Sequence, residues 1–141
     1  MNEIEIWKDI QGYENYYQVS NLGNVKSLRR TIIRKNGRPY TEKEKILRQY
    51  EDNKGYMYVC LCFNGKIKSI KVHRPVANSF IFNENNKPQV NHIDYNKKNN
   101  RVENLEWCTN LENYIHARKN TNIVNGLTLR WKYRKRGAKA E

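Results

Sequence analysis

Residues 89–117, QVNHIDYNKKNNRVENLEWCTNLENYIHA, decide the fold of this chain. Apolar and polar residues alternate over 89–94, which predicts a strand, and the polar residues 95–104 predict a loop. A second short apolar stretch predicts another strand over 105–108. Thr109 and Glu112 are three residues apart and match a capping box, which predicts a helix over 110–119. We therefore expect two strands followed by a helix.

Turn signals occupy the chain on either side of this segment. Asn64-Gly65 is the residue pair that a type I′ hairpin turn requires. Pro75 opens a predicted short helix, because proline suits a first helical position. The basic stretch 29–48 is expected to be a mobile loop that leads to a short strand near Ile46. Further predicted elements are strands around 20–24, hairpin strands over 56–63 and 66–73, a helix over 74–81 and a hairpin at Asn125-Gly126. The predicted fold class is α+β.

Three polar side chains of residues 89–117 are candidates for chemistry. His92 lies in the alternating strand, and Asn113 and His116 are spaced i,i+3, so they share one face of the predicted helix. Such a unit suits metal-assisted cleavage of a phosphodiester, in which a neutral imidazole takes a proton from water and a divalent ion neutralises phosphate charge. Asparagine occurs 21 times in 141 residues, so an Asn near a His is by itself a weak signal.

Longer matches strengthen this interpretation. VHRPVANSFI (72–81) and VNHIDYNKKNNRVENLEWCTNLENYIHA (90–117) closely resemble the HNH endonucleases of phages and mobile introns. IWKDIQGYENYYQVSNLGNVKSL (6–28) resembles the small DNA-binding motif that often precedes that nuclease module. The resemblance implies an α+β fold in which hairpins and short helices surround a ββα-metal (HNH) nuclease module with basic flanks.

The resemblance also implies roles for individual residues. His92 matches the general base that activates the attacking water. Asn113 and Asn91 match the protein ligands of a single divalent metal ion, magnesium or manganese. Asn104 matches the middle asparagine, which braces the loop between the strands and helps to hold the base. His116 matches the last histidine, for which metal ligand, phosphate contact and helix-to-core brace remain open.

Two positions depart from the family pattern. Some relatives have Asp where Asn91 stands, and an amide offers a hard cation only a neutral oxygen. Because Asn113 is neutral too, we expect weak metal binding without DNA. Tyr95 stands where the family usually has Gly, which leaves a different turn after Asp94 as an alternative. These departures support an alternative, a DNA-binding module with a crippled HNH site.

Other notable side chains have plainer interpretations. A structural hydrogen bond is the favoured role for His73, with phosphate contact as its rival. Asp94 is expected to brace its turn, and Trp107 is expected to pack in the core. The three cysteines match neither a disulfide framework nor a zinc site, and we expect buried thiols.

The charge of the chain indicates a polyanionic partner. Lys and Arg number 27 against 14 Asp and Glu, which gives a net charge of +13. Residues 118–139 carry basic side chains and no acidic one, and can bind phosphates at the expense of counterions. We expect double-stranded DNA as the partner, and RNA has less support because nothing resembles an RNA-reading module. The predicted DNA-binding residues are Arg29, Arg30, Arg34, Lys35, Arg74, Arg130, Lys132, Arg134, Lys135 and Arg136.

No membrane partner is expected, because no apolar run approaches the roughly 18 residues of a membrane span. The N-terminus, MNEIEIWKD, is acidic and does not resemble a secretory signal. We expect a phage- or intron-encoded enzyme in the cytoplasm of a bacterial host. A monomer or weak dimer is expected, and a monomer with one site would nick rather than cut both strands. The predicted segments are 1–52 (DNA-binding motif and basic loop), 53–117 (nuclease module) and 118–141 (basic tail).

Overall fold

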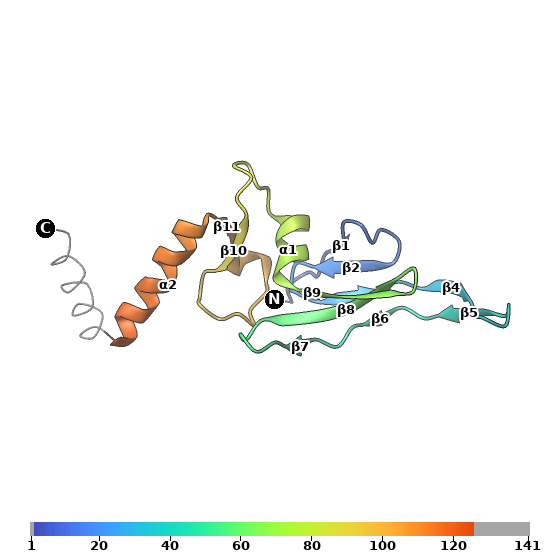
Figure 1. The fold of residues 1–141 in the computed structure, drawn as a ribbon. Helices are drawn as coiled ribbons and strands as arrows, with labels where there is room; N and C mark the ends of the chain where they lie inside the picture. The colour runs from blue at the N-terminus through green and yellow to red at the C-terminus, as the bar shows by residue number, and fades with distance from the viewer. Residues whose placement is uncertain (1, 126–141) are drawn as a thin grey trace, which may run out of the picture.

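The computed structural model describes residues 2–125, with side chains described as far as residue 121. It is α+β, as predicted, with antiparallel strands and two α-helices (Figure 1). The elements are β1 (Trp7–Asp9), β2 (Tyr17–Ser20), β3 (Val25–Ser27), β4 (Arg30–Ile33), β5 (Pro39–Glu42), β6 (Lys45–Ile46), β7 (Tyr50–Glu51), β8 (Met57–Phe63), β9 (Lys66–Lys71), α1 (His73–Phe80), β10 (Gln89–His92), the 3-10 turn η1 (Val102–Asn104), β11 (Leu105–Cys108) and α2 (Asn110–Asn125). Neither helix has the length and apolarity that a bilayer-spanning segment needs.

The strands form four antiparallel sheets in the described chain. Their orders are β1-β2-β3-β6, β4-β5, β7-β8-β9 and β10-β11. The turn between β8 and β9 has positive φ at both central residues, 50° at Asn64 and 74° at Gly65, as a type I′ turn requires. The predicted hairpins around residues 20–24 and 64–65 are therefore confirmed.

The basic stretch 29–48 is not the expected mobile loop. Its first part forms the β4-β5 hairpin, which projects from the body of the molecule (Figure 1). Gly37 has φ +76° in the turn, and the Arg34 amide donates to the Arg38 carbonyl at 3.0 Å. Asn36-Gly37 is a turn signal in the sequence, but the many charged residues around it favoured a loop. The short strand expected near Ile46 is present as β6.

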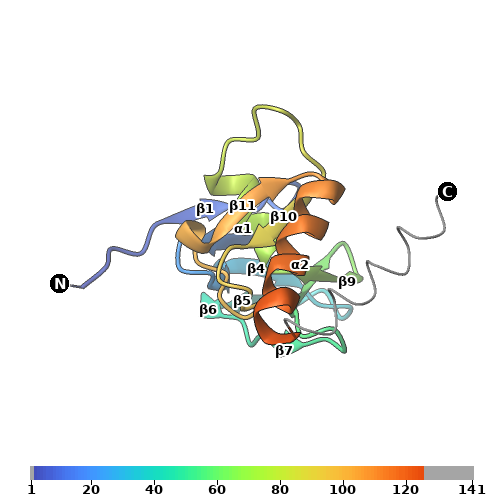
Figure 2. The ribbon, with the colours of Figure 1, turned by 90° about the vertical axis from the view of Figure 1, so that its left-hand side faces the viewer.

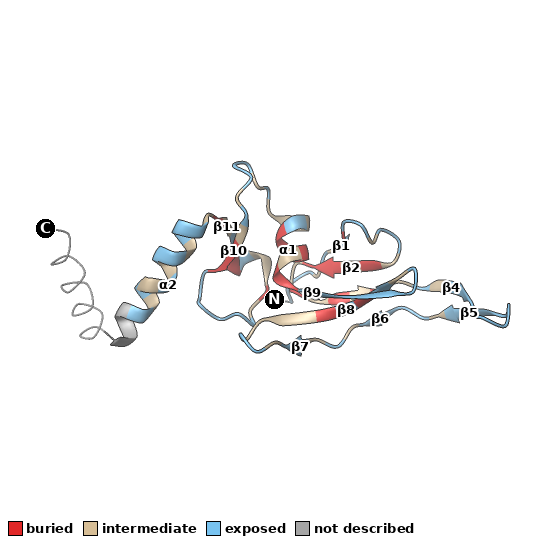
Figure 3. Cartoon of the chain, viewed as in Figure 1, coloured by how far each residue is buried: buried red, intermediate tan, exposed pale blue. Residues whose placement is uncertain are grey.

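Helix α1 lies at the centre of the molecule and packs against β2, β9, β10 and β11. Pro75 is its third residue rather than its first, a position whose missing N–H has no partner within the helix either. The core runs without a break from the first sheet through α1 to the β10-β11 hairpin (Figure 3). Its buried members are Ile10, Tyr17, Val19, Val25, Val59, Leu61, Val72, Val76, Ala77, Val90 and Leu105. The boundary predicted at residue 52 therefore divides a shared core.

Helix α2 begins with the predicted capping box. The Thr109 amide donates to Glu112 Oε2 at 2.8 Å, and the Glu112 amide donates to Thr109 Oγ1 at 3.1 Å. The helix continues to Asn125, so residues 123 and 124 are helical and not in a strand, whereas the rest of the hairpin predicted at Asn125-Gly126 lies outside the described residues. Its start packs on β10 and β11, and the rest extends away from the body (Figures 1 and 2).

The expectation of buried thiols holds for one cysteine only. Cys108 is buried, whereas Cys60 and Cys62 are exposed. Strand alternation explains the difference, because Val59 and Leu61 fill the core and their neighbours must face outward.

Candidate active site

The β10-β11 hairpin sorts the candidate residues onto two faces. Asn91 pairs with Glu106 and Gln89 with Cys108, so these side chains share one face. His92 pairs with Leu105 on the other face, toward the core. Helix α2 lies against the first of these faces, where the Asn113 amide donates to Gln89 Oε1 at 2.7 Å. The fold thus brings Asn91 and Asn113 to one side of the hairpin.

His92 is held in one orientation by Asn100. Its Nε2 lies 2.8 Å from Asn100 Oδ1, an atom that can only accept, so Nε2 carries the proton and the lone pair is on Nδ1. The residue is 5% exposed, and its ring lies beside the rings of His73 and Tyr56, with centroid distances of 5.2 and 6.0 Å. Burial lowers the pKa of His92 below its ordinary 6.5, although Asn100 and Asp94 oppose this. A neutral, oriented imidazole results.

His73 lies against the ring of His92 rather than making the expected hydrogen bond. Within residues 2–121 neither of its ring nitrogens is hydrogen-bonded, and Nδ1 is fully buried, so that expectation is wrong. Burial and the neighbouring His92 lower the pKa of His73 to about 3.

Unpaired polar atoms cluster around His92. Among residues 2–121, three buried side-chain polar atoms lack a partner, and two of them, His73 Nδ1 and Asn100 Nδ2, belong to the neighbours of His92. Buried polar atoms are usually satisfied, and exceptions occur at functional sites. This pattern favours a working site over a structural histidine.

Asn91 and Asn113 can offer oxygens to a cation. Their Nδ2 atoms donate to Glu106 Oε1 at 2.8 Å and to Gln89 Oε1 at 2.7 Å. Within residues 2–121, neither amide oxygen accepts a hydrogen bond. Both oxygens are therefore available to a hard divalent ion, which prefers oxygen ligands. Residues 2–121 contain no group of three His, Cys, Asp or Glu that could hold a metal by itself. The ion would need further oxygens from water or phosphate.

Asn104 ties together the loop between β10 and β11. Its Nδ2 donates to Asp94 Oδ1 at 2.9 Å and to the Asn99 carbonyl at 2.8 Å, and its Oδ1 accepts from the Asp94 amide at 3.0 Å. Asp94 also accepts from Asn99 at 2.8 Å, so its predicted bracing of the turn is confirmed. The direct partner of His92 is nevertheless Asn100, not Asn104.

His116 joins α2 to the end of β10. Its Nε2 donates to the Ile93 carbonyl at 3.2 Å, and its ring stacks on Tyr95 with centroids 4.1 Å apart. Because Nε2 carries the proton in this contact, the lone pair of the ring is on Nδ1. Of the three roles left open by the sequence, these contacts favour the brace.

The turn between β2 and β3 supports the same loop from the other side. Gly23 packs on the Asn100 backbone, and the Val102 amide donates to the Asn21 carbonyl at 3.0 Å. Arg101 forms an ion pair with Glu3. The N-terminal segment is therefore in contact with the residues that hold His92.

The basic residues predicted to bind DNA differ in their surroundings. Arg29, Arg34 and Lys35 are exposed at or near the β4-β5 hairpin, where Arg34 stacks on Tyr40 at 4.5 Å. Arg30 instead pairs with Glu42 at 3.3 Å and lies over the rings of Tyr16 and Tyr17. This geometry favours a structural role for Arg30. Outside the described residues lie Arg130, Lys132, Arg134, Lys135 and Arg136.

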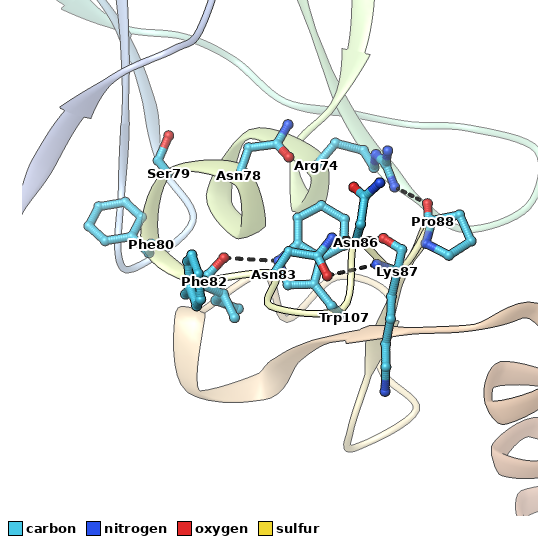
Figure 4. A pocket seen from close by; sticks show the side chains of 11 residues that line it. Arg74, Asn78, Ser79, Phe80, Phe82, Asn83, Asn86, Lys87, Pro88 and Trp107 are labelled. Carbon is cyan, nitrogen blue, oxygen red and sulfur yellow. Dashed lines mark hydrogen bonds between the residues drawn. The ribbon is translucent and has the colours of Figure 1, made fainter.

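Arg74 lines a groove of about 750 Å³ between α1 and the loop that follows it (Figure 4). It donates to the Pro88 carbonyl at 2.9 Å and lies 5.4 Å from the centre of the Trp107 ring. Trp107 packs against the core as predicted, and its Nε1 donates to the Ile81 carbonyl at 2.9 Å. The outer rim of the groove is polar, with Asn78, Asn86 and Lys87.

Sequence reasoning missed three residues that touch the site: Asn100, Glu106 and Gly23. Asn100 is one of many loop asparagines, and nothing local distinguishes it. Glu106 could have been found from the register, because strands 89–92 and 105–108 aligned end to end place it opposite Asn91. Gly23 carried no signal, since its contact with Asn100 is purely tertiary.

Comparisons with known proteins match both segments. Residues 5–62 match the family model described as NUMOD4 motif, and residues 71–114 match the model described as HNH endonuclease. The DNA endonuclease I-HmuI of Bacillus phage SP01 is 41% identical over 112 residues, which is 77% of this chain and 57% of that protein. An uncharacterized HNH endonuclease of Acanthamoeba polyphaga mimivirus is 46% identical over 86 residues, which is 60% of this chain and 26% of that protein.

A solved structure agrees with these matches. The structure described as DNA binding and cleavage by the HNH homing endonuclease I-HmuI aligns with a TM-score of 0.63 at 37% identity, over 86% of this chain and 59% of that one. The chain thus spans less than two thirds of the length of these relatives.

Proposed function

The chain combines a NUMOD4 motif with an HNH endonuclease domain and is homologous to the homing endonuclease I-HmuI and to viral HNH endonucleases; from this premise we propose that it is a metal-dependent DNA endonuclease of the homing type. The substrate is double-stranded DNA, in which it hydrolyses a phosphodiester bond. The observation that carries the proposal is the buried, neutral His92, which Asn100 fixes through Nε2, on a strand whose other face carries the Asn91 amide and meets Asn113 of α2.

His92 acts as the general base. Because its Nε2 proton is held by Asn100, Nδ1 is the atom that takes the proton from the attacking water. Burial keeps the ring neutral and so ready to accept. Asn104 acts indirectly, since it fixes the loop on which Asn100 lies.

Asn91 and Asn113 would hold one divalent ion, Mg²⁺ or Mn²⁺, through their amide oxygens. When bound, such an ion neutralises charge on the scissile phosphate and on the leaving 3′ oxygen. His116 keeps α2, and with it Asn113, in place against the hairpin. The expected ends are a 5′-phosphate and a 3′-hydroxyl. With two neutral ligands, the free protein is expected to bind metal weakly.

The phosphate backbone of DNA would be bound by the exposed basic residues of the β4-β5 hairpin and by the groove residue Arg74. The basic residues beyond 125 would bind it too. Residues 83–113 carry four basic and five acidic side chains, a net charge of −1. Binding and cutting are therefore assigned to different parts of the chain. One site per monomer implies a nick.

The test is cleavage of supercoiled plasmid and phage genomic DNA with Mg²⁺, with His92→Ala as the matched variant. We expect cleavage by the unmodified chain, none by His92→Ala and none with EDTA, at equal DNA retention for both proteins. DNA retention without cleavage by either protein would overturn the proposal in favour of a binding module. Cleavage by both proteins would refute His92 as the base.

A further inference from the structure

Glu106 is the carboxylate that faces a proposed metal ligand. It lies directly opposite Asn91 in the register of β10 and β11, and its Oε1 accepts from Asn91 Nδ2 at 2.8 Å. Asn91 is 7% exposed, whereas Glu106 is exposed to solvent. A solvent-facing carboxylate thus holds a buried amide.

The other acids with contacts in this part of the chain are engaged elsewhere. Asp94 binds the loop amides, Glu103 pairs with Arg101 at 3.1 Å, and Glu112 pairs with Lys87 at 2.9 Å. Glu106 takes part in no ion pair within residues 2–121. Its charge is therefore not neutralised by a basic side chain in that range.

The hydrogen bond fixes which end of the Asn91 amide faces the ion. A carboxylate can only accept, so Nδ2 must turn toward Glu106 and Oδ1 must turn away from it. Asn113 is oriented in the same way by Gln89, but that partner is neutral. Partners behind a metal ligand orient it and increase its basicity, and their loss typically weakens metal binding.

We propose that Glu106 is a positioning residue of the metal site, which turns the Asn91 carbonyl oxygen toward the cation and supplies the negative charge that the two amide ligands lack. The inference rests on the proposed function, because it takes Asn91 as a ligand. It also explains how a site with neutral amide ligands can attract a divalent ion once phosphate is present.

The experiment measures Mn²⁺ binding from the electron paramagnetic resonance signal of the free ion. The full chain with His92→Ala is bound to a duplex that it retains, so the DNA stays intact. Glu106→Gln keeps an acceptor for Asn91 and removes the charge. Glu103→Gln is the matched control, because it changes the net charge equally and touches neither ligand. We expect Glu106→Gln to weaken Mn²⁺ binding by roughly 10- to 100-fold and Glu103→Gln to leave it unchanged.

A rescue separates this role from a structural one. Asn91→Asp added to Glu106→Gln moves the carboxylate onto the ligand itself and should restore Mn²⁺ affinity, whereas a fold defect would not respond. Thermal melting shows that each variant is folded. Unchanged affinity in Glu106→Gln, or no recovery in the folded double variant, would overturn the inference while DNA cleavage by the unmodified chain still supports the function. Absence of both Mn²⁺ binding and cleavage in the unmodified chain would overturn the function itself.

Discussion

Replacing Gly23 by alanine tests whether the N-terminal turn supports the loop that holds His92. Gly23 has φ +85°, and a Cβ there lies 2.9 Å from the Asn100 carbonyl oxygen and 3.0 Å from its carbonyl carbon and Cβ. Favourable contacts between carbon atoms lie at about 3.5–4.0 Å, so something must move. Asn100 is not free to retreat, because its Oδ1 lies 2.8 Å from His92 Nε2.

The expected loss of stability has two parts. Left-handed backbone costs an alanine about 1–2 kcal/mol, and overpacking adds about 1–3 kcal/mol. Gly12 provides the matched control, because it has the same φ of +85° but a Cβ there meets nothing within 4 Å. Gly12→Ala should therefore cost only the backbone part. The reduced entropy of the unfolded chain is common to both substitutions and cancels.

Urea unfolding measures both variants. Gly23→Ala should have a free energy of unfolding lower than that of Gly12→Ala by about 1–3 kcal/mol. DNA cleavage by Gly23→Ala should also fall at unchanged DNA retention, because a displaced Asn100 no longer orients the base. Equal unfolding free energies for the two variants would refute the close packing of the turn on the loop.

Three further results are expected. Burial lowers the pKa of His92 below 6.5. Since the base must be neutral, the cleavage rate plotted against pH should fall on the acid side with a midpoint below that value. A midpoint above it contradicts the assignment of His92 as the base. His73 has a pKa of about 3 when folded against an ordinary 6.5, so the unfolded chain binds the extra proton and stability should fall as pH drops between these values. The free energy of unfolding should change by up to about 1.4 kcal/mol per pH unit in this range. Urea titrations at several pH values should show a smaller change in His73→Gln. Arg34→Ala with Lys35→Ala should reduce the slope of log affinity for DNA against log salt by up to about two, and an unchanged slope would show that the hairpin does not touch phosphates.

Local signals in the sequence were sufficient for much of the fold. Asn64-Gly65 and the Thr109–Glu112 capping box each specify a turn or a helix start through contacts within a few residues, and both are present. The β4-β5 hairpin was missed although Asn36-Gly37 is a signal of the same kind. There the density of positive charge suggested a solvated loop, whereas strand pairing satisfied the backbone regardless of the exposed side chains.

The site was predictable only where the family pattern names a residue. That pattern led to His92, Asn91 and Asn113, but not to their partners. Asn100 and Glu106 reach the site through the register of β10 and β11 and through loop closure, and Gly23 through a contact between distant segments. Such contacts depend on how the loop packs, which hydrophobic periodicity does not encode.

Two departures from the family pattern were the grounds for a chain that binds DNA without cutting it. One was Tyr95 in place of glycine, yet Tyr95 adopts φ +64°, the left-handed conformation that glycine favours. In residues 2–125 the other non-glycine residues with positive φ are all asparagines, so a tyrosine there carries strain of about 1–2 kcal/mol. Such strain persists where the surroundings hold it, and here the ring stacks on His116 while Asn104 binds Asp94. The turn after Asp94 therefore has the backbone conformation that a glycine at position 95 would favour. The other departure was the neutral Asn91, and Glu106 faces it with a carboxylate that takes part in no ion pair within residues 2–121. Since neither substitution removes an oriented base or an available ligand oxygen, the geometry favours the enzyme over the binding module.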